Sequence, residues 1–526
     1  MITAAQLAEN NGADGKALWV QIGTQVFDLT KFAALHPGGK AVLARHAGTD
    51  CTEQFKLFHN ELVLPKYASR LPVVGFVGAA TEAQLQDEAK RARLRQTLLD
   101  SKAVGSLVPF ADPFWYQRSS HSPYYKPTHF KFRDRVRAFV DGEFLPGVEE
   151  WADSQRPPAK LMLRLGEEGF LAAMAGGPPF PARFLDAGTP TIDDFDYFHC
   201  HIVFDEFARC GNAAVMAAIT NGAGIACSAI LRYGSDELQR RVLPDVLMGR
   251  KLIALGVSEP AAGSDVSGLS TELRNVAGTA EAEVTGTKKW ITNGTYAEWI
   301  TLLAKDGDEG GMSLVLVPTD AAGFTSKKVN VRNSDVSGTA LLDLDRVRVP
   351  RANIVGKRGA GWAMQMSAFN FERMYLVSIM LRMSRCVLDE CIRYALKREA
   401  FGVKLHEIQS VRMRVAEMIR DIESVAAWTE AVLFQMCALP HARAQVALGD
   451  VIASVKVQAA LVYERCARHA LHVFGGNAVQ ARGVGHKVEP ALAQSKGFLI
   501  PAGAQDVMDD FAARQCFKLA KQVARL

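Results

Sequence analysis

The chain has 526 residues, of which 48% are hydrophobic and 22% are charged, so it can bury several cores. Its formal net charge of +5 is small for this length and no run of Lys or Arg stands out, which argues against nucleic-acid and membrane-surface partners. Its nine cysteines form no CxxC pair, and the N-terminus shows no basic-apolar secretory pattern. We therefore expect an intracellular, multidomain protein with reduced thiols.

The first domain, residues 1–78, mixes short strands with short helices. Leu18–Ile22 and Gln25–Leu29 predict a hairpin around Gly23 and Thr24. His36 is followed by Pro-Gly-Gly, and His59 comes 23 residues later, with apolar side chains between them. Two imidazoles that face each other across an apolar slot can take both axial positions of a haem iron. Such an iron has no open position, which favours electron transfer over oxygen chemistry.

This segment resembles cytochrome b5, whose hallmark is the His-Pro-Gly-Gly turn followed by an Asp-x-Thr-Glu-x-Phe run and a second histidine. Here the run is Asp50-Cys51-Thr52-Glu53-Gln54-Phe55, and the spacing to His59 is about one residue shorter than the family pattern. The resemblance implies haem b with His36 and His59 as its iron ligands. The alternative is a turn histidine and an unrelated one, with no cofactor.

A linker, residues 79–127, follows the first domain. Residues 82–100 have the charge density of a solvated helix. Residues 104–128 combine four prolines with many aromatic side chains, which predicts an ordered tether lying on a surface because aromatics seek burial.

The rest of the chain predicts three further domains. Residues 128–253 have a helical period, residues 254–352 alternate like strands, and residues 353–526 form long helices. The uncharged run Gly211–Leu231 is long enough to cross a bilayer. It is rich in Ala and Gly and lacks aromatic flanks, so we expect a buried helix and no membrane span.

Four segments of these domains carry the ligand chemistry. Gly256–Gly268 places hydroxyls and carboxylates on flexible backbone, which suits a phosphate-bearing ligand. Trp290–Gly294 offers an indole for packing against a ring and a hydroxyl for hydrogen bonding. Arg398–Leu405 with Gln409 offers a guanidinium fork to a pyrophosphate. Phe474–Asn477 is a Gly-Gly loop.

From about residue 128 to 526 these segments resemble the acyl-CoA dehydrogenases. The resemblance implies an all-α helical domain, a β-sandwich or barrel-like domain and a C-terminal four-helix bundle, with FAD as the cofactor and acyl-CoA as the substrate. The FAD contacts that it implies are Ser258, Ser264, Trp290, Thr292, Arg398, Phe401, Gln409, Gly475 and Gly476. The implied substrate contacts are Ser264, Asn370 and Arg373. His472 stands where the family usually has a glutamine.

One long helix over residues 361–398 bears on the oligomeric state. Glu372 and Arg398 are 26 residues apart, which corresponds to about 39 Å along a helix. One cofactor does not reach both ends, so we expect FAD to be shared in a homodimer or homotetramer, as the resemblance also implies for Arg398, Phe401 and Gln409. The alternative for Arg398 is an ion pair at a helix end.

The base of the reaction is the most informative position. Removing an α-proton from a thioester needs a carboxylate in a dry pocket, where burial raises its pKa. Many family members carry this glutamate in a Tyr-Glu-Gly-Thr segment, but here that segment is Pro501-Ala502-Gly503-Ala504. Long-chain and isovaleryl members carry it in a Glu-Arg pair. This chain has Glu372-Arg373, so the resemblance implies that Glu372 is the catalytic base.

The sequence therefore predicts FAD-dependent conversion of acyl-CoA to trans-2-enoyl-CoA, with the haem domain accepting electrons from the reduced flavin. Alternatives are an oxidase that reduces oxygen and, because of Ala502, an inactive acyl-CoA-binding electron carrier. Nitroalkane oxidation ranks last, since it uses an aspartate where Glu372 stands. Ala524-Arg525-Leu526 fits a peroxisomal address, and the cytoplasm is the alternative. Acyl chain length and the terminal electron acceptor stay open.

Overall fold

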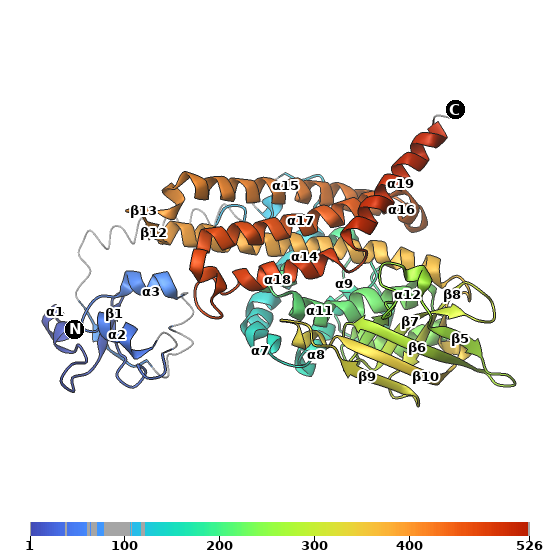
Figure 1. Ribbon diagram of the computed structural model, residues 1–526, viewed down its shortest axis with the longest axis horizontal. Helices are drawn as coiled ribbons and strands as arrows, with labels where there is room; N and C mark the ends of the chain where they lie inside the picture. The colour runs from blue at the N-terminus through green and yellow to red at the C-terminus, as the bar shows by residue number, and fades with distance from the viewer. Residues whose placement is uncertain are drawn as a thin grey trace. The chain divides into compact units, whose positions relative to one another are not determined.

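The computed structural model describes residues 2–36, 39–59, 64, 71–77, 106, 108–116 and 121–523. The predicted linker helix at 82–100 and the tripeptide 524–526 lie outside these residues. The chain forms two compact units (Figure 1). The first comprises residues 1–120, 389–415 and 470–489, and the second comprises residues 121–388, 416–469 and 490–526.

The N-terminal domain is built on a three-stranded antiparallel sheet in the order β1-β2-β3. Its strands are β1 (Trp19–Ile22), β2 (Gln25–Asp28) and β3 (Val73–Phe76), and its helices are α1 (Ala4–Glu9), α2 (Lys40–His46) and α3 (Thr52–Phe58). The register Ile22↔Gln25 confirms the predicted hairpin. Alternate strand residues point to one face, which buries Val20 and Phe27 in a common core.

The described part of the linker is ordered. Trp115 and Tyr116 lie in a short 3₁₀ helix, η2 (Phe114–Tyr116), and both side chains are buried. Their rings meet edge to face at a centroid distance of 4.6 Å. These two residues therefore agree with the tether that the aromatic content predicts.

The second unit begins with a layer of helices. They are α6 (Pro127–Phe139), α7 (Val148–Ala152), α8 (Ala159–Glu167), α9 (Phe170–Met174), α10 (Tyr197–Phe207), α11 (Ala213–Asn221), α12 (Cys227–Tyr233) and α13 (Asp236–Leu247). Every residue of α10 is buried, as expected of a central helix. Its Glu206 pairs with Arg137 of α6 at 2.8 Å, so the charge of this buried carboxylate is matched.

The apolar run that the sequence predicts to be a buried helix is helical and buried in the structure. The stretch Ala213–Tyr233 joins α11 to α12 through a π-helical turn, η7 (Gly222–Ala226). It is long and apolar enough to cross a membrane, but 83% of its most apolar window is buried inside the protein, as in core helices of soluble proteins. The bent pair His441–Ala447 and Gly449–Val479 passes the same length and composition test only when joined.

A mostly antiparallel sheet follows these helices. Its strands are β4 (Ile253–Gly256), β5 (Glu272–Asn275), β6 (Glu281–Ile291), β7 (Trp299–Asp306), β8 (Met312–Pro318), β9 (Phe324–Lys328), β10 (Ala340–Pro350) and β11 (Ile354–Val355). The order is β11-β8-β7-β5-β6-β10-β9, and β4 pairs with β7 in parallel. The central strands β7 and β8 are almost fully buried, as their continuous apolar sequences predict.

Long helices complete the chain: α14 (Gly361–Lys397), α15 (Gln409–Ala438), α16 (His441–Ala447), α17 (Gly449–Phe474), α18 (Val488–Leu499) and α19 (Gln505–Val523). In the second unit, Arg385 of α14 pairs with Glu423 of α15, and Arg465 of α17 pairs with Asp421 of α15. Figure 1 shows α14, α15 and α17 running alongside one another. The predicted single helix is confirmed, because α14 is unbroken and ends one residue before Arg398.

Candidate active site

Glu372 lies on the buried face of α14. Its exposed fraction is 5%, and its Oε2 atom has no hydrogen-bond partner among the described residues. Burial disfavours the ionised form and raises the pKa of this carboxyl to about 7, against the lowering effect of Arg373 and Lys456. At neutral pH such a group both holds and releases a proton, which is the property that a general base needs.

Aromatic side chains line the neighbourhood of Glu372. Tyr375, three residues further along α14, stacks on Phe204 of α10 at a centroid distance of 4.5 Å. Its hydroxyl donates to Asn221 Oδ1 at 3.1 Å, which links α14 to α11. Phe371 packs between Tyr197 and Phe204. These aromatic contacts form an apolar layer between α14 and α10 in the part of α14 that carries Glu372.

Ala502 stands where many family members carry the catalytic glutamate, and it lies against the same part of α14. Arg373 donates from Nε to the carbonyl of Ala502 at 2.9 Å and from Nη1 to Asn370 Oδ1 at 2.8 Å. Asn370 in turn donates to the carbonyl of Gln445 at 3.2 Å. The turn at Ala502 therefore lies against the part of α14 that carries Glu372 and Arg373, and Ala502 itself has no carboxyl group.

The loop Gly256–Gly268 is anchored by a buried ion pair. Lys288 donates to Glu259 Oε1 at 2.7 Å and to the carbonyl of Val257 at 3.1 Å. Burial alone would raise the pKa of Glu259, but the hydrogen bonds from Lys288, Thr271 and Ser270 lower it to about 2. The charge on both groups is satisfied, so this pair fixes the start of the loop.

A β-bulge turns Trp290 outward beside this loop. Ala340 pairs with Ile291 and Leu341 pairs with Lys289, so Trp290 is an extra residue in β6, with φ of 68°. Its indole is 55% exposed. The Lys289 amide donates to the carbonyl of Ser258 at 2.9 Å, so the structure brings Ser258 next to Trp290, as predicted.

The remaining predicted contacts of this region are accessible. Thr292 is half-buried just after the bulge, and Ser264 is exposed on the loop. An exposed indole, two accessible hydroxyls and a fixed loop backbone fit the edge of a flavin, because such a ring needs a stacking partner and hydrogen-bond donors.

A second set of predicted FAD contacts lies in the first unit. Arg398, Gly475 and Gly476 line one hollow of about 400 Å³ together with Tyr394 and His472. A Cβ atom built on either glycine meets nothing within 4 Å, so the backbone there is open to a ligand. Phe401 and Gln409 do not line this hollow. Phe401 is 96% exposed on the turn between β12 (Glu399–Ala400) and β13 (Val403–Lys404).

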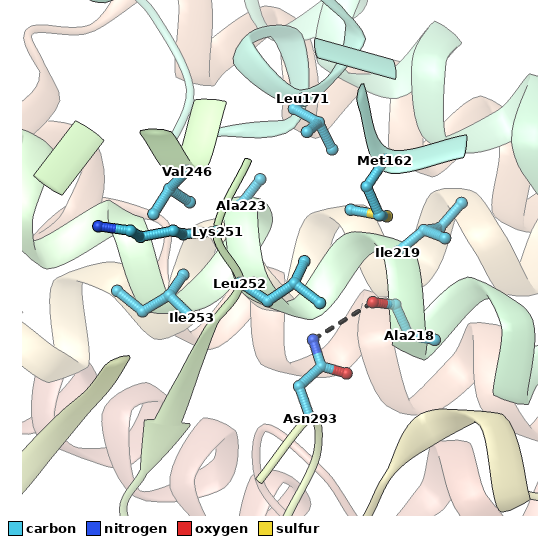
Figure 2. Close-up of a pocket in the computed structure, with 11 residues that line it drawn as sticks. Met162, Leu171, Ala218, Ile219, Ala223, Val246, Lys251, Leu252, Ile253 and Asn293 are labelled. Carbon is cyan, nitrogen blue, oxygen red and sulfur yellow. Dashed lines mark hydrogen bonds between the residues drawn. The ribbon is translucent and has the colours of Figure 1, made fainter. Parts of the chain in front are cut away.

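A small cavity beside η7 does not take part in this site. Figure 2 shows it between Met162, Leu171, Ile219 and Leu252, with Asn293 at its edge. Its volume of about 10 Å³ holds at most one water molecule, and its walls are apolar. Asn293 donates to the carbonyl of Ala218 at 3.2 Å, which ties the strand end after Trp290 to α11.

In the N-terminal domain, the rings of His36 and His59 face each other. Their centroids are 5.9 Å apart, which leaves room for one metal ion with bonds of about 2 Å on each side. Burial, followed by the effect of His36, lowers the pKa of His59, so its imidazole is neutral and able to ligate a metal. The buried Nδ1 of His36 has no hydrogen-bond partner among the described residues. The pair fits a six-coordinate haem iron.

Another group of metal-ligand type has a structural role. His129, Asp196 and His199 lie within ligand distance of one another. Asp196 Oδ1 accepts from His129 Nε2 at 2.9 Å and from two backbone amides as the N-cap of α10, while the Asp196 amide donates to His199 Nδ1 at 3.2 Å. His129 Nδ1 accepts from the Lys126 amide at 2.8 Å. Hydrogen bonds therefore explain the cluster without an ion.

Family models match four segments of the chain. Family models for the N-terminal, middle and C-terminal domains of acyl-CoA dehydrogenases match residues 126–250, 254–344 and 359–517. The model for a cytochrome b5-like haem/steroid binding domain matches residues 3–78. The acyl-CoA dehydrogenase apdG of Emericella nidulans is 35% identical over 425 residues, which cover 79% of this chain and 97% of that protein.

This chain belongs to the acyl-CoA dehydrogenase family. A structure titled as a putative acyl-CoA dehydrogenase from Mycobacterium smegmatis is 28% identical, with a TM-score of 0.68 over 75% of this chain and 99% of that one. A Bacillus anthracis acyl-CoA dehydrogenase whose title states that it is complexed with FAD shares the fold at 21% identity, with a TM-score of 0.68 over 77% of this chain and 69% of that one.

The protein is thus a FAD-dependent oxidoreductase with a cytochrome b5-like domain fused ahead of it. The two facing histidines favour haem over steroid in that domain, because a steroid needs no metal ligand.

Sequence reasoning missed three residues of the site. Lys288 and Lys456 are fully buried lysines, and Asn293 is a buried amide with φ of 65°. Lys288 and Asn293 lie within or beside the Trp290 motif, where their spacing alone says nothing of burial. Lys456 lies in a plain helical pattern, and no local signal marks it.

Proposed function

We propose that this protein oxidises an acyl-CoA thioester to trans-2-enoyl-CoA, with Glu372 removing the α-proton. The observation that carries the proposal is the burial of an unpaired carboxyl group whose pKa is raised to about 7. Membership of the family supports the substrate class, and Asn370 and Arg373, which flank the base in sequence and are hydrogen-bonded to each other, are assigned to the CoA portion.

Different residues of the chain are assigned to proton removal and to cofactor binding. Ionised Glu372 accepts the α-proton on a carboxylate oxygen, and the buried apolar side chains near Tyr375 keep water away from the thioester. FAD, bound along Ser258, Trp290 and Thr292, supplies the acceptor for the hydride that leaves the β-carbon. The products are enoyl-CoA, reduced flavin and a protonated Glu372, which returns its proton to solvent.

Replacement of the base tests the proposal. Glu372→Gln preserves the shape of the side chain but accepts no proton, so we expect kcat to fall by roughly 10²-fold to 10⁴-fold. Turnover is measured with an artificial electron acceptor over a panel of acyl-CoA lengths, and the visible flavin spectrum reports bound FAD. Glu390→Gln, on the same helix but paired with Lys487 near the surface, is the matched control. Unchanged turnover in Glu372→Gln would show that another group is the base, whereas a wild type without turnover would favour the inactive carrier.

The pH dependence follows from the raised pKa of Glu372. Only the ionised carboxylate accepts the α-proton, so kcat/KM is expected to rise as the pH increases through about 7 and to lose this limb in Glu372→Gln. An unperturbed glutamate would place the limb near pH 4.5. A wild-type profile that is flat from pH 5 to 8 would contradict the assignment.

We further propose that the N-terminal domain receives electrons from the reduced flavin. His36 and His59 would hold a haem there, and a haem so held would supply a one-electron acceptor. Anaerobic stopped-flow mixing with acyl-CoA is expected to show reduction of the haem bands after flavin bleaching. His59→Ala should remove the haem bands and leave the bleaching intact. Haem bands that stay unchanged, with peroxide released in air, would favour the oxidase.

A second copy of the chain completes the FAD site in this proposal. The exposed Phe401, Arg398 and Gln409 follow the far end of α14, the helix that carries Glu372, and they are assigned to the cofactor of a neighbouring subunit. Light scattering of the FAD-loaded protein should give twice or four times the 57.3 kDa of one chain, and the mass of a single chain would rule this arrangement out.

A further inference from the structure

Lys456 of α17 is a buried cation without a carboxylate of its own. Its side chain is fully buried, and among the described residues no carboxylate forms an ion pair with its Nζ atom. Instead Nζ donates to the carbonyl of Gly503 at 2.9 Å and lies 3.5 Å from the carbonyl of Leu499. Burial of an ammonium group costs folding free energy, which indicates that Lys456 has a role in this part of the protein.

The same turn is held by a second cation. Arg373 of α14 binds the carbonyl of Ala502, so two helices grip neighbouring peptide groups of the turn between α18 and α19. Ala502 and Gly503 both have positive φ, 57° and 108°, a conformation that an alanine rarely adopts unless its surroundings impose it. The turn is therefore fixed by Arg373 and Lys456.

Both cations act on Glu372. Among the groups that influence the charge of this carboxyl, Arg373 of α14 and Lys456 of α17 favour its ionised form. The phenol of Tyr375 is the other titratable neighbour, and its pKa lies far above neutral because of burial and of Glu372. Burial, then Arg373, lowers the pKa of Lys456 to about 8, so at pH 7 it still carries its proton.

We propose that Lys456 is a positioning residue for the base: it holds the 499–503 turn, which Arg373 of α14 also binds, and thereby keeps a positive charge in the neighbourhood of Glu372. The inference rests on the proposed function, in which Glu372 takes the α-proton. Lys456 does not exchange a proton with substrate in this account. Its charge raises the fraction of molecules in which Glu372 is ionised before substrate binds, and its hydrogen bonds keep the turn in place.

Two substitutions separate the charge from the hydrogen bonds. Lys456→Gln removes the charge and retains a donor for the turn, and Lys456→Arg retains both. We expect the acid limb of kcat/KM to move to higher pH by roughly one unit in Lys456→Gln and to stay at the wild-type position in Lys456→Arg. An acid limb that does not move in Lys456→Gln would overturn the proposal, since a purely structural lysine would alter activity without shifting the limb.

A titration that needs no turnover provides the second readout. Infrared difference spectra of the FAD-loaded protein report the carbonyl band of protonated Glu372, with Glu372→Gln as the subtraction standard. The midpoint of this band is expected to rise in Lys456→Gln, and an unchanged midpoint would overturn the inference. The two failures are distinct. Full activity in Glu372→Gln contradicts the proposed function. Loss of activity in Glu372→Gln, together with an unchanged acid limb and infrared midpoint in Lys456→Gln, contradicts only the role of Lys456.

Discussion

The catalytic half of this molecule depends on one constraint: the carboxyl group of Glu372 is enclosed by protein, and its Oε2 atom has no hydrogen-bond partner among the described residues. Desolvation penalises the charge of Glu372, and the cations Arg373 and Lys456 compensate in part, so the pKa comes to about 7 instead of far above it. With burial alone, the carboxyl of Glu372 would stay protonated at neutral pH. With a cation in direct contact, it would stay ionised and would be a poor proton acceptor. The packing of α14 against α10, α11 and α17 sets this balance.

The sheet solves a different problem, because a flavin edge needs accessible groups held rigidly. The Lys288–Glu259 pair fixes the loop that carries Ser258 and Ser264, and the bulge in β6 turns Trp290 outward. Rigidity comes from buried charges, and accessibility comes from one extra residue in a strand. In this site the buried Lys288–Glu259 pair holds the backbone, and the exposed Trp290 and Ser264 are accessible to a ligand.

Much of the architecture could be predicted from local patterns. The hairpin at Gly23, the strand region after residue 254 and the unbroken helix carrying Glu372 follow from periodicity, and the burial of Glu372 follows from the apolar residues around it. Lys456 could not be found in this way, because its partner Gly503 is 47 residues away and the contact depends on how α17 and α18 pack. The approach of the turn at Ala502 to the part of α14 that carries Glu372 could likewise not be predicted from local sequence patterns.

Proton removal at the α-carbon by Glu372 is the central claim, and isotope exchange measures it directly. An acyl-CoA whose β-carbon is replaced by sulfur can lose an α-proton but cannot lose a β-hydride, so the FAD-loaded protein in heavy water should wash deuterium into its α-position. Mass spectrometry should find this exchange in the wild type and a loss of it in Glu372→Gln. Exchange at the same rate in both proteins would contradict the account.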